Sequence, residues 1–132
     1  MRFWPIFLFI LASCEQRNES MQNAKCLSCN FFLGKRGDDN YVILQENTGT
    51  QKIKVLYDSV ANINGQNCRV FFHRRNEYIV VAPAGDSISS TSFQSQDEMF
   101  EYLNKDQTVI GDHAIPSAES MYEMLPPRIS CK

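Results

Sequence analysis

The stretch that decides the fold is residues 62–82, which read NINGQNCRVFFHRRNEYIVVA. Asn64-Gly65 near its start is the strongest short signal of a β-hairpin, because a type I′ turn needs positive φ at both central residues. Beyond it, Cys68, Val70 and Phe72 recur at every second position and share one face of the expected strand. A polar turn then leads into the apolar run that closes the stretch. The stretch therefore predicts antiparallel strands joined by tight turns.

Segments upstream extend this pattern. Tyr41–Glu46 is rich in strand-forming residues, and Phe31-Phe32-Leu33 is interpreted as a core strand. Ile53, Val55 and Tyr57 alternate with lysines, which is the period of a strand with one buried face. We therefore predict a small antiparallel β-meander of about four to five strands.

The period changes after the strands. Ser95-Gln96-Asp97-Glu98 has the form of a capping box, in which the serine and glutamate side chains satisfy free backbone N–H groups at a helix start. Met99, Phe100 and Leu103 then recur at helical spacing. This pattern predicts a helix over 95–104 that packs on one face of the sheet.

A second short helix is expected from Ala118 to Met124. Ser117 is a suitable N-cap, and Pro126-Pro127 ends the segment because proline cannot continue a helix. The fold class predicted from these patterns is α+β: a small antiparallel meander with one or two short C-terminal helices, stapled by disulfides.

The N-terminus has the layout of a secretory signal. Arg2 precedes an apolar run, Phe3–Leu11, that is too short to span a bilayer, which needs about 20 apolar residues. It has the length of a signal-peptide core. Leu11-Ala12-Ser13-Cys14 then follows, and it resembles the signal of bacterial lipoproteins at each position. An ordinary secretory signal that happens to contain a cysteine is the alternative interpretation.

The resemblance implies that residues 1–13 are removed and that Cys14 carries acyl chains, palmitate among them, because several chains anchor a protein stably where one is marginal. Residues 14–25 are polar and are expected to form a flexible tether, with one globular domain over 26–132. Glu15 follows the cysteine, and the lack of aspartate there favours the outer membrane, facing the periplasm, in proteins of this class.

Five cysteines are present. Acylation of Cys14 leaves four, and four cysteines in an oxidising compartment predict two disulfides. Three pairings are possible, and the sequence alone does not determine which of them forms. The four residues are Cys26, Cys29, Cys68 and Cys131.

The chain carries 13 basic and 15 acidic residues, a net charge of −2. This balance, with no basic run, gives no support for nucleic-acid binding. No residue pattern predicts a cofactor, a metal site or a catalytic group. His73 and His113 are the only histidines and lack the surroundings of a nucleophile, so a small hydrolase is the least favoured function.

Cys26-Leu27-Ser28-Cys29 has the spacing of a thiol–disulfide redox site, in which the first thiol lies at a helix N-terminus. A polar segment precedes it here rather than a strand, so a redox protein using Cys26 and Cys29 is the alternative function. A cluster of basic residues on one hairpin end is the candidate surface for an acidic partner. It comprises Arg69, His73, Arg74 and Arg75.

Together these features predict a membrane-anchored cell-envelope lipoprotein that is not an enzyme. Its small globular domain is expected to bind another protein, as immunity proteins, inhibitors, exclusion factors and secretion accessory subunits do. The identity of that protein partner is not encoded in any pattern of the sequence.

Overall fold

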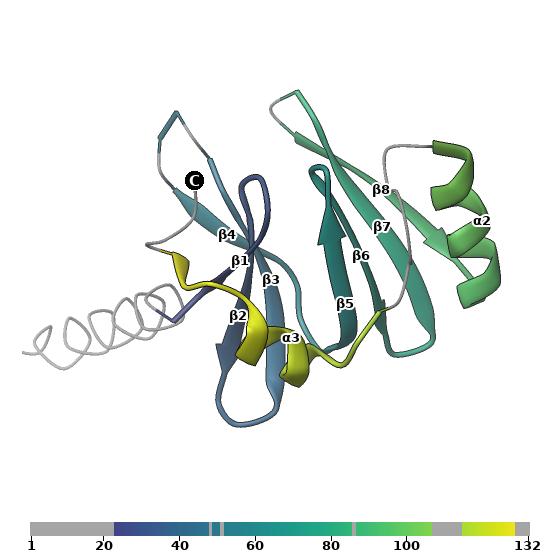
Figure 1. Cartoon of the computed structure of the whole chain (residues 1–132). Helices are drawn as coiled ribbons and strands as arrows, with labels where there is room; N and C mark the ends of the chain where they lie inside the picture. The colour runs from purple at the N-terminus through teal and green to yellow at the C-terminus, as the bar shows by residue number, and fades with distance from the viewer. Residues whose placement is uncertain (1–22, 48, 51, 86, 107–114, 129–132) are drawn as a thin grey trace, which may run out of the picture.

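The computed structural model describes residues 23–47, 49–50, 52–85, 87–106 and 115–128, which contain two four-stranded antiparallel sheets (Figure 1). In each sheet the strands pair in the order of the chain. The N-terminal sheet consists of β1 (Lys25–Ser28), β2 (Phe31–Arg36), β3 (Asn40–Glu46) and β4 (Ile53–Tyr57). The C-terminal sheet consists of β5 (Val60–Gln66), β6 (Arg69–Arg74), β7 (Glu77–Ala84) and β8 (Ser87–Phe93).

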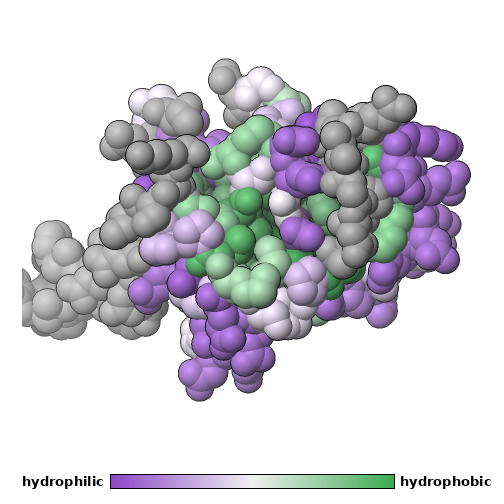
Figure 2. Space-filling model, viewed as in Figure 1, coloured by the Kyte–Doolittle hydropathy of each residue, from purple (hydrophilic) through white to green (hydrophobic). Residues whose placement is uncertain are grey.

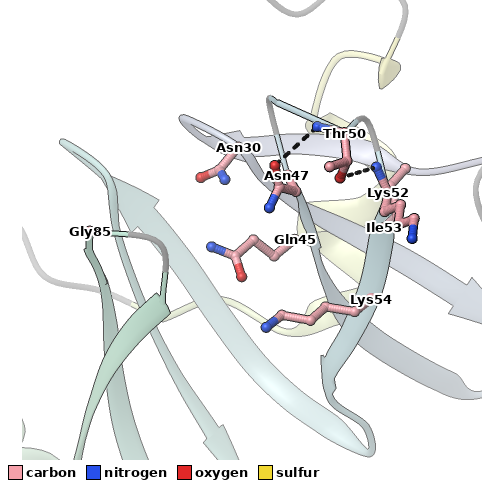
Figure 3. A pocket seen from close by; sticks show the side chains of 8 residues that line it. All are labelled: Asn30, Gln45, Asn47, Thr50, Lys52, Ile53, Lys54 and Gly85. Carbon is pink, nitrogen blue, oxygen red and sulfur yellow. Dashed lines mark hydrogen bonds between the residues drawn. The ribbon is translucent and has the colours of Figure 1, made fainter.

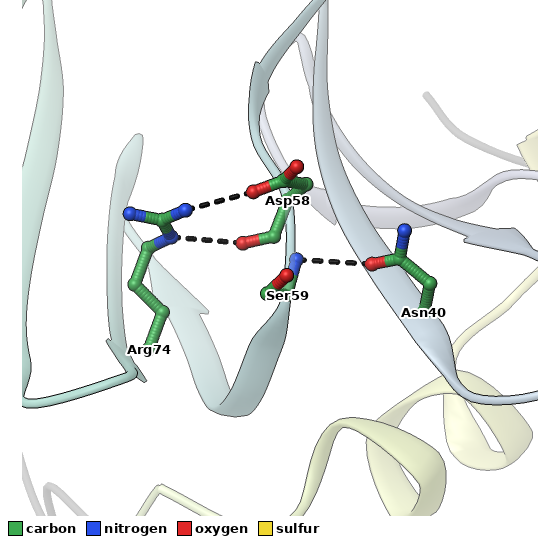
Figure 4. A network of polar contacts seen from close by, with 4 residues as sticks. All are labelled: Asn40, Asp58, Ser59 and Arg74. Carbon is green, nitrogen blue, oxygen red and sulfur yellow. Dashed lines mark hydrogen bonds and ion pairs between the residues drawn. The ribbon is translucent and has the colours of Figure 1, made fainter.

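The α+β class agrees with the sequence prediction, but a single meander of four to five strands was too small. The chain changes sheets at Asp58-Ser59. Ser59 has a φ of 56°, and its N–H donates to Asn40 Oδ1 at 3.0 Å (Figure 4). A left-handed residue at this point turns the backbone out of β4 and into β5 of the other sheet. Neither glycine nor proline occurs at this crossover between the sheets, which explains why the sequence pattern predicted a single sheet.

The main core lies between the facing sides of the two sheets. Figure 2 shows apolar residues gathered in this central region, with hydrophilic residues on the flanks. The N-terminal sheet contributes Phe31, Leu33, Tyr41 and Ile43. The C-terminal sheet contributes Val60, Ile63, Val70, Phe72, Ile79 and Val81.

Both predicted helices are present. Helix α2 (Gln96–Asp106) covers the outer face of the C-terminal sheet, where Met99 and Leu103 are buried against Phe71 and Val80. Phe100 packs partly buried beside them, as expected. The Ser95 hydroxyl accepts from the N–H of Glu98, whereas the Glu98 carboxylate accepts from Gln94 rather than Ser95. Ser95 therefore caps the helix as predicted, whereas the reciprocal bond to Glu98 is shifted by one residue from the ideal box.

Helix α3 (Ala118–Met124) has the predicted bounds and the predicted cap. The Ser117 hydroxyl accepts from the Ser120 N–H at 3.2 Å. Ala118 and Met121 are buried in the main core. The helix therefore closes one end of the space between the two sheets.

The predicted hairpin turn at Asn64-Gly65 was wrong. Both residues lie inside β5, and the turn is formed three residues later by Asn67 and Cys68, with φ values of 51° and 64°. These angles are the ones a type I′ turn requires. Gly65 has a different role: a Cβ there would lie 3.4 Å from the backbone carbonyl of Leu27, so the glycine allows β1 to approach.

The predicted alternation in β4 holds from Ile53 to Val55 but is interrupted before Tyr57. Ile43 pairs with Tyr57 whereas Leu44 pairs with Val55, so Leu56 is an extra residue in a β-bulge. The bulge reverses the faces on either side of it. Tyr57 packs against the main core, whereas Ile53 packs against a separate cluster on the outer face of the N-terminal sheet.

The folded domain begins earlier than expected, because Ala24 is 1% exposed and Lys25 is the first residue of β1. The lipoprotein-like signal and Cys14 lie outside the described residues. Within the described ranges, no helix has the length and apolar character to cross a membrane.

Candidate functional site

A polar pocket opens between the tips of the β3–β4 and β7–β8 hairpins (Figure 3). Its volume is about 360 Å³. We call it the inter-hairpin pocket. One wall comes from the N-terminal sheet and the opposite wall from the turn of the C-terminal sheet. Its lining residues are Asn30, Gln45, Asn47, Thr50, Lys52, Ile53, Lys54 and Gly85.

Side-chain amides fix the loops around this pocket. The Asn30 Nδ2 donates to the carbonyl oxygen of Glu46 at 2.7 Å, which ties the β1–β2 turn to the end of β3. Asn47 Oδ1 accepts from the N–H groups of Gly49 and Thr50 at 2.9 and 3.2 Å. These bonds hold the β3–β4 turn in place, so the pocket wall is preorganised.

The bulge in β4 determines which charged groups face the pocket. Lys54 pairs with Gln45 across the ladder, and both side chains extend into the space facing Gly85 (Figure 3). With uninterrupted alternation from Tyr57, Lys54 would lie on the opposite face of the sheet. The extra residue at Leu56 thus brings an ammonium group into the gap between the sheets.

The pocket has an excess of positive charge and of hydrogen-bond donors. Neither the Lys52 nor the Lys54 ammonium has an ion-pair partner among the described residues, and the described lining contains no carboxylate. Gln45 and Asn47 add amide donors. This arrangement is chemically suited to accept a carboxylate from a bound molecule.

The two sheets are also joined by a contact outside the pocket lining. The Tyr57 hydroxyl and the Ser90 hydroxyl lie 2.7 Å apart, and the Tyr57 ring packs on Phe72 with centroids 4.9 Å apart. Tyr57 therefore connects β4 with β8 and with the main core.

The basic cluster predicted from the sequence is not one surface. Arg69 begins β6 and Arg74 ends it, so the two lie at opposite ends of a strand about 16 Å long. Arg74 lies on the opposite face of β6 from Arg69 and His73. The His73 ring stacks on Tyr78 with ring centroids 4.3 Å apart. Arg75 is exposed in the β6–β7 turn.

Arg74 has a structural role. Its Nε donates to the Asp58 carbonyl oxygen at 2.8 Å and its Nη2 to Asp58 Oδ1 at 2.7 Å (Figure 4). The side chain of Arg74 is only 15% exposed. The hydrogen bond from Arg74 lowers the pKa of Asp58, and the charge of the same guanidinium acts in the same direction. This ion pair holds the crossover between the sheets and leaves Arg74 little freedom to contact a partner.

The structure shows which disulfide pairing Cys29 adopts. Cys29 is bonded to Cys68, with Cα atoms 5.1 Å apart. Cys26 is disulfide-bonded as well, whereas Cys131 lies outside the described residues, as does His113. The pairing of Cys26 with Cys29 is therefore excluded, and Cys26–Cys131 is the remaining possibility for a second disulfide within the globular domain.

The inter-hairpin pocket was not found from the sequence. The alternation in the sequence predicts that Lys52 and Lys54 lie on the solvent-facing side of their strand. No local signal indicates the bulge at Leu56, which places these lysines on the opposite face of the sheet. In the described ranges, no group of His, Cys, Asp or Glu residues is placed to hold a metal ion.

Comparison with known proteins supplies no relative: no family model, curated protein or solved structure matches this chain.

Proposed function

We propose that this protein is a membrane-anchored lipoprotein of the bacterial cell envelope whose domain binds another protein through the inter-hairpin pocket. The anchor rests on the resemblance of Leu11-Ala12-Ser13-Cys14 to a lipoprotein signal. The polar segment that follows Cys14 would lift the domain away from the lipid surface. The proposed location is the outer membrane, facing the periplasm.

The observation that carries the binding function is the charge of Lys52 and Lys54 in a preformed pocket, where the described residues supply no ion-pair partner for either ammonium group. The chain as a whole is mildly acidic, at −2, so two ammonium groups at one opening, with no carboxylate in its described lining, are a local exception. An acidic segment of a partner would supply the missing carboxylates, and complementary charge would speed its association. The partner class we propose is therefore a protein with an exposed acidic segment.

The pairing of Cys29 with Cys68 lends no support to the redox alternative. A Cys-x-x-Cys enzyme needs its two thiols to form a disulfide with each other. Here Cys26 lies within β1, whereas Cys29 directly follows that strand and is bonded to Cys68.

Charge reversal in the pocket tests this proposal. The full-length chain is expressed in its own host and cross-linked to its neighbours in the envelope, and the products are identified by mass spectrometry. The double variant Lys52→Glu/Lys54→Glu should lose an acidic partner that the unsubstituted protein captures. Lys105→Glu is the matched control, because Lys105 lies on α2 and pairs with Glu101 at 3.5 Å, outside the pocket.

The partner should also dissociate as salt rises, because screening weakens contacts between exposed charges. Capture that is equal for the pocket variant, the control and the unsubstituted chain would show that the lysines do not form the binding site.

A further inference from the structure

Two of the four outer strands are covered by other segments. The outer side of β1 pairs with the C-terminal segment, where the Cys26 N–H donates to the Pro126 carbonyl at 2.9 Å. The outer side of β5 pairs with the segment before α3, where the Ile63 N–H donates to the Pro116 carbonyl at 3.0 Å. These contacts satisfy backbone groups that would otherwise be free at the sheet edges.

The third outer strand, β4, is protected in another way. It is short, contains the bulge at Leu56 and carries Lys54. Bulges and lysines are common devices that prevent an edge strand from pairing with another chain.

The fourth outer strand, β8, has none of these protections from the part of the chain that the structure describes. Its seven residues, Ser87–Phe93, read SISSTSF and contain no charge and no proline. It pairs with β7 in continuous register with no bulge. Exposed and regular edges of this kind are templates for adding a strand.

The register shows which backbone groups of β8 are free. Pro83 has no N–H and lies opposite Ile88, which identifies this pair as a non-hydrogen-bonded one. Antiparallel pairs alternate, so Ser90 and Ser92 occupy the equivalent positions. The N–H and C=O groups of Ile88, Ser90 and Ser92 therefore point away from β7, and within the described residues no backbone partner meets them.

We propose that β8 pairs antiparallel with β8 of a second copy of this chain, symmetrically about Ser90. In that register Ser90 lies opposite its own copy and Ile88 lies opposite Ser92. The outward groups of both strands then satisfy one another in about six hydrogen bonds. The two C-terminal sheets become one continuous sheet across a closed twofold interface.

A second copy fits this edge because the strand is complementary to itself. β8 contains no charged residue, so pairing of two copies brings no like-charge repulsion between the strands. The exposed side chains at Ser90 and Ser92 are small and allow the backbones to approach. This dimer is independent of the proposed protein-binding function, because the pocket lies at the hairpin tips and the dimer uses the strand edge.

Symmetry provides the test. Cysteine at position 90 would face its own copy with Cα atoms about 5.5 Å apart, within the range of a disulfide. Cysteine at position 92 would be about 13 Å from its copy, which is too far. The full-length variants Ser90→Cys and Ser92→Cys are produced in the oxidising envelope and compared on non-reducing gels.

We expect a covalent dimer from Ser90→Cys and at least tenfold less from Ser92→Cys. Adding Ser92→Pro to Ser90→Cys should abolish the dimer, because the ring removes an outward N–H, whereas adding Ser92→Ala should preserve it. Equal cross-linking at 90 and 92, or none at either, would overturn the proposal.

Sedimentation of the unsubstituted protein gives a second measurement that does not depend on introduced cysteines. A chain that remains monomeric up to about 1 mM would overturn the proposal, as would open-ended oligomers. If Ser92→Pro instead releases a different protein from a monomeric chain, the edge serves that protein and not a second copy.

Discussion

The hydroxyl groups of Tyr57 and Ser90 lie 2.7 Å apart, and this contact joins the outer strands β4 and β8 of two different sheets. The strands diverge from this point toward the hairpin tips, where the inter-hairpin pocket opens. The same contact lies beside the free edge of β8. The contact therefore joins the two sheets next to the edge where the proposed dimer would form.

Removing that bond should loosen the pair of sheets without unfolding them. Tyr57→Phe keeps the ring that packs on Phe72 and should lower the free energy of unfolding by about 0.5–1.5 kcal/mol, the usual net contribution of one hydrogen bond. Urea unfolding measures this change. Ser90→Ala should have a similar effect, and the double variant should be less destabilised than the sum of the two. Full additivity would show that the hydroxyl groups do not interact.

The disulfide between Cys29 and Cys68 should contribute strongly to stability. The cysteines are 39 residues apart, and closing a loop of that size restricts the unfolded chain. The double variant Cys29→Ser/Cys68→Ser should be destabilised by about 2–4 kcal/mol in thermal or denaturant unfolding. Peptide mapping without reduction should recover a Cys29–Cys68 cross-link from the unsubstituted protein. Recovery of a Cys26–Cys29 link would contradict the pairing.

Much of the fold follows from local sequence patterns. The capping serines at 95 and 117 and the helical spacing of Met99 and Leu103 specify both helices, because these signals lie within a few residues of the structure they stabilise. The strand segments were also identified by alternation. The partition of these strands into two sheets was not predicted. It depends on the left-handed conformation of Ser59, which the presence of a serine does not indicate.

The position of the β5–β6 turn and the candidate site could not be predicted for a related reason. Asn64-Gly65 is a strong turn signal, yet burial of Ile63, Val70 and Phe72 and the bond at Cys68 set the register and move the turn to Asn67. Similarly, the face of Lys54 is set by the bulge at Leu56. Both features arise from contacts between segments distant in sequence, which a periodicity of two residues does not contain.

Stability should depend on the charge of Asp58. Its pKa is lowered from the ordinary value of 3.8 by the hydrogen bond from Arg74, so the folded state favours the carboxylate. The resulting stabilisation is present above the ordinary pKa and is lost as pH falls through the lowered one. Unfolding measured from pH 6 down to about pH 2 should show this loss, and Asp58→Asn should remove it. An unchanged pH profile in Asp58→Asn would contradict the role of the pair.

Acylation of Cys14 should decide how the protein is processed. Cys14→Ser removes the thiol that would receive the lipid, so uncleaved precursor should accumulate and radiolabelled palmitate should not be incorporated. The control Cys26→Ser keeps the lipidation cysteine and should be labelled like the unsubstituted chain, although its fold is weakened. Correct cleavage and release of Cys14→Ser as a soluble protein would favour the ordinary secretory signal.

The register of β8 can be tested by two prolines placed in the same strand. Ser89 lies opposite Ala82 in a hydrogen-bonded pair, so Ser89→Pro removes a donor to β7 and should lower the free energy of unfolding by about 1–3 kcal/mol. Ser92→Pro removes a donor that points to solvent in the single chain, and proline is tolerated there on an edge strand. It should change the free energy of unfolding of the monomer by less than about 1 kcal/mol. Denaturant unfolding at low protein concentration compares the two variants, with Ser89→Ala and Ser92→Ala as controls for loss of the hydroxyls. A larger loss from Ser92→Pro would mean that the alternation is reversed, in which case Ser89 and Thr91 present the free edge.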